Sequence, residues 1–222
     1  MHETFDQNNY HALCDLLAKT DDDLALIVSQ YGYPPFWTRP NTFESLVHII
    51  LEQQVSLASA LAAMNKLKAK LGTVTPESFL TLTDEALKLC YFSRQKMIYG
   101  RDLAAYLVSA QLSLMQLETL PDHEIREQLK RVKGIGDWTV DIYLIFILHR
   151  INVFPIGDLA AVNAVKSLKR LAKETTKEML LQVVDVWTPY QTIATMMLWH
   201  FYLEERKPEN RKKIKTQKSI AE

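Results

Sequence analysis

The sequence contains few residues of the kind that build metal centres or disulfide frameworks. It has only two cysteines, Cys14 and Cys90, which lie far apart and beside apolar residues. A structural zinc site or an iron–sulfur cluster needs about four ligands, so neither is expected. We predict that both cysteines are buried free thiols in a reducing compartment.

Long apolar runs are also missing. The longest wholly apolar run, Ile142 to Leu148, is far shorter than the roughly 20 residues that span a bilayer. The first residues, Met1 to Asp6, lack the basic patch and apolar stretch of a signal peptide. We therefore expect a cytoplasmic protein with no membrane partner, and take a monomer as its expected state.

The chain has no excess of charge of either sign. Lys plus Arg and Asp plus Glu each total 26, so net charge gives no support for nucleic-acid binding. A neutral protein can still bind DNA when its basic residues gather on one face. The 222 residues, 48% of them hydrophobic, are enough to bury a substantial core.

Helix start and stop signals recur along the chain, whereas strand alternation does not. Candidate helix caps are Asn41, Ser56, Thr75, Thr83, Ser93 and Asp158, each followed by apolar residues at helical spacing. The segment Trp138 to His149 is apolar on nearly every side, which is typical of a buried central helix. We predict an all-α fold of about ten helices, and a flexible basic tail over 206–222.

The turn Val132-Lys133-Gly134-Ile135-Gly136 joins two predicted helices. Glycine permits a positive φ and lets another backbone approach closely. The helix that follows directs unpaired N–H groups outward, which favours phosphate. On its own, this turn is more often a plain connector than a phosphate site.

Asp158 lies 22 residues after Gly136, beyond the buried helix and a loop that contains Pro155 and Gly157. An aspartate before an apolar helix is ordinarily an N-cap. The same position favours an ionised carboxylate, which can stabilise a cationic sugar and orient or deprotonate a water molecule. The two roles are compatible.

The hairpin, the loop with Pro and Gly, and the aspartate together resemble the helix-hairpin-helix (HhH-GPD) superfamily of base-excision DNA glycosylases. Within it, the chain resembles the 3-methyladenine DNA glycosylase II family over roughly residues 36–203. The resemblance implies two helical subdomains with the active cleft between them. We expect one subdomain from about 41–130 and a second from the N-terminal helices plus about 131–205, within one domain of residues 1–205.

The resemblance also implies a role for individual residues. Asp158 falls on the catalytic aspartate, and Trp138 falls where bifunctional relatives carry a nucleophilic lysine. Trp199 matches an aromatic wall of the base pocket; Tyr143 and Trp37 are further pocket candidates, although core packing explains both more simply. The positions implied to contact DNA are Gln53, Gln54, Ser56, Lys133, Gly134, Ile135, Gly136 and Thr139, with Gln53 and Gln54 in the loop that fills the gap left by an extruded base. Carbonyls of Lys130, Val132 and Ile135 match a monovalent cation site for Na⁺ or K⁺.

These expectations describe a monofunctional glycosylase that removes alkylated purines of the 3-methyladenine and 7-methylguanine type from duplex DNA. An electron-rich pocket suits a base that carries positive charge. No other cofactor is expected, and the absence of lysine at position 138 argues against lyase chemistry. The alternatives are a superfamily relative that acts on uracil, mismatched thymine or an oxidised purine, and a non-catalytic module that only grips the DNA backbone. A helical scaffold with no DNA partner is the least favoured.

Overall fold

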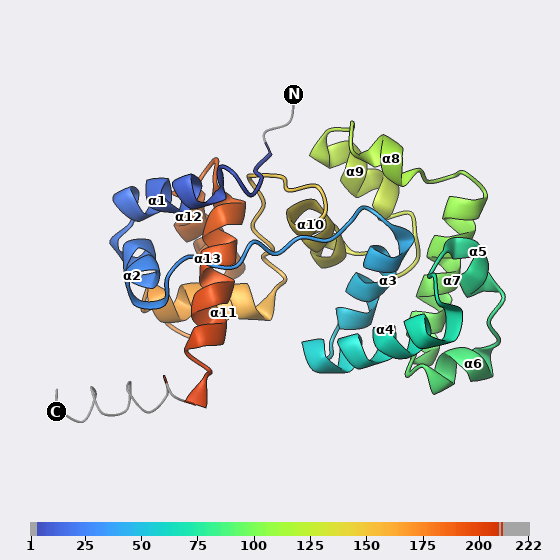
Figure 1. Ribbon diagram of the computed structural model, residues 1–222. Coiled ribbons are helices and arrows are strands. Elements are labelled where there is room, and N and C mark those ends of the chain that lie inside the picture. The colour runs from blue at the N-terminus through green and yellow to red at the C-terminus, as the bar shows by residue number, and fades with distance from the viewer. Residues whose placement is uncertain (1–3, 209, 211–222) are drawn as a thin grey trace. The chain divides into compact units, whose positions relative to one another are not determined.

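The computed structural model describes residues 4–208 and 210 (Figure 1). The described part of the chain has no strand beyond a single β-bridge between Thr4 and Arg150, so the all-α prediction is confirmed. It folds into thirteen helices: α1 (Tyr10–Thr20), α2 (Asp22–Tyr31), α3 (Phe43–Glu52), α4 (Leu57–Leu71), α5 (Pro76–Leu80), α6 (Asp84–Leu89), α7 (Arg94–Val108), α8 (Leu114–Leu117), α9 (Asp122–Leu129), α10 (Asp137–Phe146), α11 (Leu159–Leu168), α12 (Lys177–Asp185) and α13 (Gln191–Glu204). Most of the basic tail expected at 206–222 lies outside the described residues.

The chain divides into two compact units, and the first is discontinuous in sequence. Unit 1 comprises Met1–Trp37 and His149–Glu222. Its centre is α13, which is buried on all sides along Thr192 to Phe201 and contacts α1, α2 and α11 (Figure 1). A helix buried on every side is mostly apolar, and α13 is the core on which the N-terminal helices and α11 pack.

Unit 2 comprises Thr38–Leu148 and contains α3 to α10. In it α7 packs against α3, α5 and α6, while α10 packs against α3 and α9. Every residue of α10 from Thr139 to Ile145 is buried, as the apolar sequence predicts. We placed residues 131–148 with the second subdomain, but α10 clusters with the middle segment, because α3 and α9 cover its apolar surface.

Local capping signals are mostly confirmed. Each helix cap predicted at Ser56, Thr75, Thr83, Ser93 and Asp158 accepts a hydrogen bond from a backbone N–H in the first turn of its helix. The prediction of Asn41 is wrong: Thr42 caps α3. The Asn41 amide instead donates to the Leu114 carbonyl, so a contact distant in sequence takes this side chain away from the cap.

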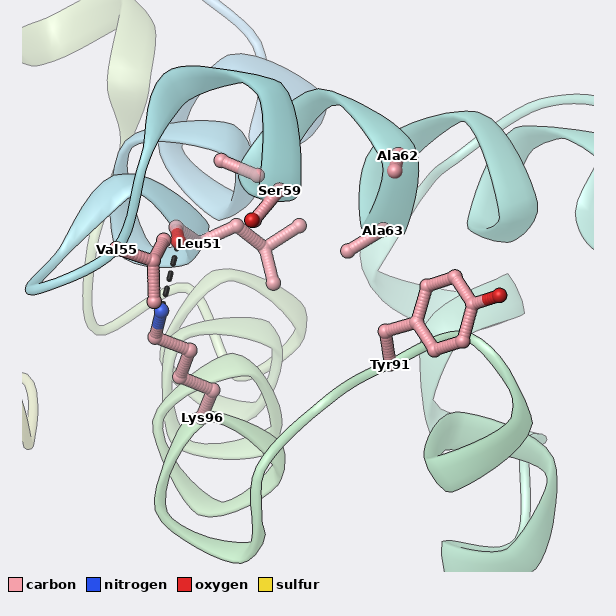
Figure 2. Close-up of a pocket in the computed structure, with 8 residues that line it drawn as sticks. Leu51, Val55, Ser59, Ala62, Ala63, Tyr91 and Lys96 are labelled. Atoms are coloured by element: carbon pink, nitrogen blue, oxygen red, sulfur yellow. Dashed lines mark hydrogen bonds between the residues drawn. The ribbon is translucent and has the colours of Figure 1, made fainter.

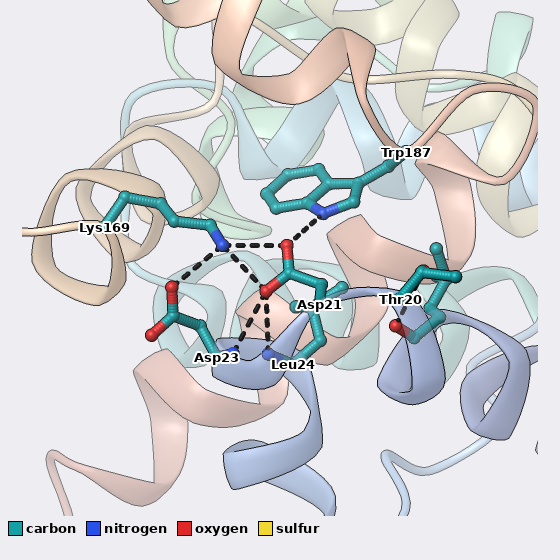
Figure 3. Close-up of polar contacts among 7 residues, drawn as sticks. Thr20, Asp21, Asp23, Leu24, Lys169 and Trp187 are labelled. Carbon is teal, nitrogen blue, oxygen red and sulfur yellow. Dashed lines mark hydrogen bonds and ion pairs between the residues drawn. The ribbon is translucent and has the colours of Figure 1, made fainter.

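A partly buried polar cluster joins three parts of unit 1 (Figure 3). Asp21 caps α2, and its carboxylate accepts from Lys169 Nζ at 2.7 Å and Trp187 Nε1 at 2.8 Å. Lys169 also pairs with Asp23 at 2.8 Å. Burial of Asp21 opposes ionisation, but the hydrogen bonds from Lys169 and Trp187 outweigh it and lower the pKa of this carboxyl. The cluster joins the N-terminal helices to the C-terminal third of the chain.

The two cysteines match the expectation from the sequence. Cys14 and Cys90 are buried free thiols, and burial raises the pKa of the Cys14 thiol to about 12. No helix in the described part of the chain has the length and apolar character needed to cross a bilayer.

Candidate active site

Asp158 begins α11 and makes two hydrogen bonds through one carboxylate oxygen. Its Oδ1 accepts from the backbone N–H of Ala161 at 2.8 Å and from Trp199 Nε1 at 3.0 Å. The Asp158 side chain is half-buried, and the N-terminus of α11 favours its negative charge. The carboxylate is therefore held in one orientation.

Helix α13 positions the chain that leads to Asp158. Thr192 is fully buried; its hydroxyl donates to the Arg150 carbonyl at 2.6 Å and accepts from Val153 N–H at 2.9 Å. Trp199 lies seven residues later, two helical turns along the same face. One face of α13 thus fixes both the start of the loop that runs from Arg150 to Asp158 and the aspartate at its end.

The predicted hairpin joins α9 to α10 in unit 2. Gly134 has φ +85°, and a Cβ added there would overlap the Tyr99 ring. Gly136 differs: its φ is −108°, and a Cβ would meet nothing within 4 Å. Our expectation of positive φ therefore holds only for Gly134, whose close neighbour is the Tyr99 side chain and not a second backbone.

The hairpin leaves donors available for an anion. No side chain caps α10 at Gly136, and among the described residues the amides of Gly134 and Gly136 donate no hydrogen bond. An uncapped helix N-terminus with open amides is suited to binding phosphate. Lys133 is exposed beside them.

Charges around the hairpin are partly paired. The Asp137 carboxylate is 2.7 Å from Lys130 Nζ, which reduces the repulsion that an acid at this place would exert on phosphate. The backbone N–H of Lys133 donates to Asp102 at 2.7 Å, so the Lys133 side chain, and not its amide, is left to meet an anion.

The two glutamines after α3 have different environments. Gln53 Nε2 donates to the Gly134 carbonyl and to Thr139 Oγ1, both at 2.9 Å. Gln54 is exposed and has a positive φ of 57°. Of the two, only Gln54 has a side chain that projects into solvent, as a residue that inserts into DNA must.

A family model described as HhH-GPD superfamily base excision DNA repair protein matches residues 47–189 of this chain. The chain belongs to the HhH-GPD superfamily. DNA-3-methyladenine glycosylase 1 of Schizosaccharomyces pombe is 31% identical over 180 residues, which cover 79% of each protein. A DNA-3-methyladenine glycosylase of Bacillus subtilis is 26% identical over 211 residues, 90% of this chain and 70% of that protein.

Solved structures give the same relationship. The S. pombe 3-methyladenine DNA glycosylase in complex with abasic DNA matches with a TM-score of 0.78 and 29% identity, over 85% of this chain and 95% of that one. A DNA-3-methyladenine glycosidase of Bacillus halodurans matches with a TM-score of 0.70 and 28% identity, over 91% and 92% of the two chains.

The other residues that the resemblance predicts to contact DNA differ in their exposure to solvent. Ser56 is exposed and caps α4, so it stays a candidate. Thr139 and Ile135 are buried at 2% and 5% exposure. Because their side chains lie in the interior of unit 2, only their backbone groups stay candidates for contact with DNA.

The aromatic candidates also differ in exposure. Trp138, in the first turn of α10, and Trp37 are half-buried, whereas Trp199 is 8% exposed. Tyr143 is fully buried, and its hydroxyl donates to Asn41 Oδ1 at 2.9 Å. Tyr143 is therefore a core residue of unit 2 and leaves the list of pocket candidates.

The hairpin carbonyls fit a monovalent cation by their chemistry. Lys130 follows the last residue of α9, so its carbonyl lies at a helix C-terminus, where carbonyl groups carry partial negative charge. The Val132 carbonyl accepts from Ile135 N–H at 3.1 Å and keeps a second lone pair. Neutral carbonyl oxygens suit Na⁺ or K⁺ better than a divalent ion. The described residues hold no group of three or more His, Cys, Asp or Glu placed for a metal.

Proposed function

We propose that this protein is a DNA glycosylase that hydrolyses the N-glycosidic bond of alkylated purines in duplex DNA. Its substrates are of the 3-methyladenine and 7-methylguanine type, and its products are the free base and an abasic site. The observation that carries the proposal is the Asp158 carboxylate, fixed by Ala161 N–H and Trp199 Nε1 at a helix N-terminus. The relatives named above support the substrate class.

Asp158 supports hydrolysis through its charge. As the bond between C1′ and the base nitrogen breaks, its electron pair leaves with the base and positive charge builds on the sugar. A fixed carboxylate stabilises that charge. It also orients the water whose oxygen forms the new bond to C1′, and accepts the proton that this water loses. Because Asp158 Oδ1 already accepts two hydrogen bonds, its orientation is set before substrate binds.

Base recognition is assigned to Trp138 and Trp199, with Trp37 as a third candidate. An alkylated purine carries positive charge, which indole faces attract through cation–π interaction. The same charge makes the base a good leaving group, so no strong general acid is required. The enzyme reaches such a base by extruding it from the duplex, and we assign Gln54 to the space that it leaves.

The hairpin is assigned to the DNA backbone. The amides of Gly134 and Gly136, with Lys133, would bind phosphate without reading sequence. Carbonyls of Lys130, Val132 and Ile135 would hold a Na⁺ or K⁺ ion, which supplies positive charge toward the same phosphate.

We further propose that the enzyme is monofunctional, of the DNA-3-methyladenine glycosylase II type. Trp138 stands where a lyase would need a nucleophilic lysine, and an indole cannot form a Schiff base. Borohydride added during turnover should trap no covalent protein–DNA complex. A trapped complex would overturn this part of the proposal.

The test of the function is release of free base from defined duplexes. Oligonucleotides that contain 3-methyladenine or 7-methylguanine should lose the base. Duplexes with uracil, mismatched thymine or 8-oxoguanine are tested in parallel as alternative substrates. Release of uracil, thymine or 8-oxoguanine without release of the methylated purines would favour a superfamily enzyme for another lesion. DNA binding with no base release at all would favour a non-catalytic module.

A further inference from the structure

Gln53 connects two segments that lie far apart in sequence. Its side-chain amide donates to the Gly134 carbonyl, 81 residues away, and to Thr139 Oγ1, 86 residues away. One acceptor lies in the hairpin and the other in the first turn of α10. All of these residues belong to unit 2.

We propose that Gln53 is a positioning residue that fixes Gln54 relative to the phosphate-binding hairpin. The inference rests on the proposed function and adds a role that neither segment has alone. The Gly134 carbonyl belongs to a residue whose amide is open to phosphate. Gln54 is the next residue in the chain, and its Cα atom is about 3.8 Å from that of Gln53. The Gln53 side chain therefore links the hairpin directly to the residue before the one that enters the duplex.

The end of α3 is held at two more points before this loop begins. Arg39 binds both carboxylate oxygens of Glu52, at 2.6 and 3.0 Å. Lys96 Nζ donates to the Leu51 carbonyl at 2.7 Å, as the dashed line in Figure 2 shows. Leu51, Glu52 and Gln53 are thus each tied to a different part of unit 2.

Gln54 and Val55 come next, and their side chains make no hydrogen bond or ion pair with the described residues. Gln54 and Val55 are exposed, and Val55 lines the open pocket beside Lys96 (Figure 2). This sequence of three anchored residues and then an exposed one is what insertion into DNA requires. A side chain that must enter a stacked duplex at one place is effective only if the backbone that carries it is held rigidly.

The test replaces Gln53 with methionine, which has similar length and no donor. Gln111, exposed in the α7–α8 connection of unit 2, provides the matched control Gln111→Met. Insertion of the Gln54 side chain into DNA is measured first. The probe is the fluorescent base 2-aminopurine, placed beside a tetrahydrofuran abasic analogue in a duplex. Wild type and the control should raise its fluorescence on binding; Gln53→Met should give less than half that rise at saturation, with Kd changed less than about threefold.

The same variants are then measured for single-turnover release of 7-methylguanine. Gln53→Met should lower the saturated rate about tenfold when the lesion is paired. The loss should shrink to less than about threefold when the lesion faces an abasic site, because less of the duplex must be opened. A general structural defect would slow both substrates equally.

Outcomes separate the inference from the proposed function. Fluorescence and paired-lesion rates equal to those of Gln111→Met would overturn the role of Gln53, even in an active enzyme. A wild type that binds and inserts but releases no base would overturn the proposed function alone. If Gln53→Met unfolds at a lower temperature than the control, Thr139→Val, which removes one of the two acceptors, should show the same pattern with a loss of about threefold. A Thr139→Val variant equal to the control would then overturn the inference.

Discussion

Trp199 donates its indole N–H to Asp158 across 3.0 Å, and the second tryptophan–aspartate pair of unit 1 has the same form. Trp187 donates to Asp21 at 2.8 Å, and both aspartates are helix N-caps. Both aspartates are half-buried, but Asp21 is also bound by Lys169 at 2.7 Å. The Trp187–Asp21 pair stabilises the fold, and we assign the Trp199–Asp158 pair to catalysis.

Replacing Trp199 with phenylalanine keeps an aromatic ring and removes the donor. A hydrogen bond to a charged group contributes about 1.5–3 kcal/mol, and each 1.4 kcal/mol is a factor of about ten in rate. We predict that Trp199→Phe lowers single-turnover base release at least tenfold and leaves DNA binding within about threefold. Trp187→Phe, the matched change, should lower stability with no comparable loss of the rate per folded molecule. Equal rates for Trp199→Phe and wild type would show that the bond does not serve catalysis.

The hairpin glycines should respond differently to substitution. Gly134→Ala would place a Cβ against Tyr99 at positive φ, and we expect a loss of more than about 1 kcal/mol in unfolding free energy. At Gly136 there is open space, so Gly136→Leu should cost about 1 kcal/mol or less while weakening DNA binding at least tenfold. Urea denaturation and fluorescence anisotropy measure the two effects. Tight DNA binding by folded Gly136→Leu would remove the hairpin from the interface.

Gln54 offers a substitution that removes the side chain without straining the backbone. Its φ of 57° is one that glycine adopts at no steric cost. Gln54→Gly should therefore keep the melting temperature of wild type or raise it, yet release base from duplex DNA about tenfold more slowly. Normal duplex activity in this variant would exclude Gln54 from the gap left by the base.

The Asp21 cluster predicts how stability depends on pH. The pKa of Asp21 is lowered in the folded protein, so its contribution is present above the ordinary aspartate pKa and is lost as pH falls through the lowered value. The pKa of Lys169 is raised by Asp21 and Asp23 against the effect of burial; its contribution is present below the ordinary lysine pKa and is lost as pH rises through the raised value.

Asp21→Asn should therefore cost about 2 kcal/mol or more at neutral pH, since it leaves Lys169 with a weaker set of partners. It should also flatten the acid limb of a plot of unfolding free energy against pH. Urea titrations of both proteins between pH 3 and 7 provide the measurement. An acid limb as steep as that of wild type would mean that other carboxylates govern acid stability.

Local sequence patterns predicted most of the helices because caps and apolar periodicity act within a few residues. Ser56, Thr83 and Asp158 each cap the helix that follows them, and α10 is as buried as its composition implies. The four residues of α8 are too few for a periodic pattern to be recognised. Asn41 failed as a cap because its partner, Leu114, lies 73 residues away.

The sequence predicts the landmarks of the candidate site but not the contacts between them. Asp158 and the hairpin were found through their order and separation. The contact of Gln53 with Gly134 was not, since a polar residue after a helix gives no local sign of a partner 81 residues away. Thr192 did carry a signal, as a polar residue in an apolar helix, and its buried hydrogen bonds explain why it is there.

Asp158→Asn tests the central claim most directly. Asparagine keeps the size and the N-cap, and removes the negative charge that we assign to the sugar cation. With a duplex containing 7-methylguanine, wild type should release the free base, and Asp158→Asn should bind the same duplex with similar Kd but release base about 10²–10³-fold more slowly. Release by Asp158→Asn at the wild-type rate would contradict the mechanism.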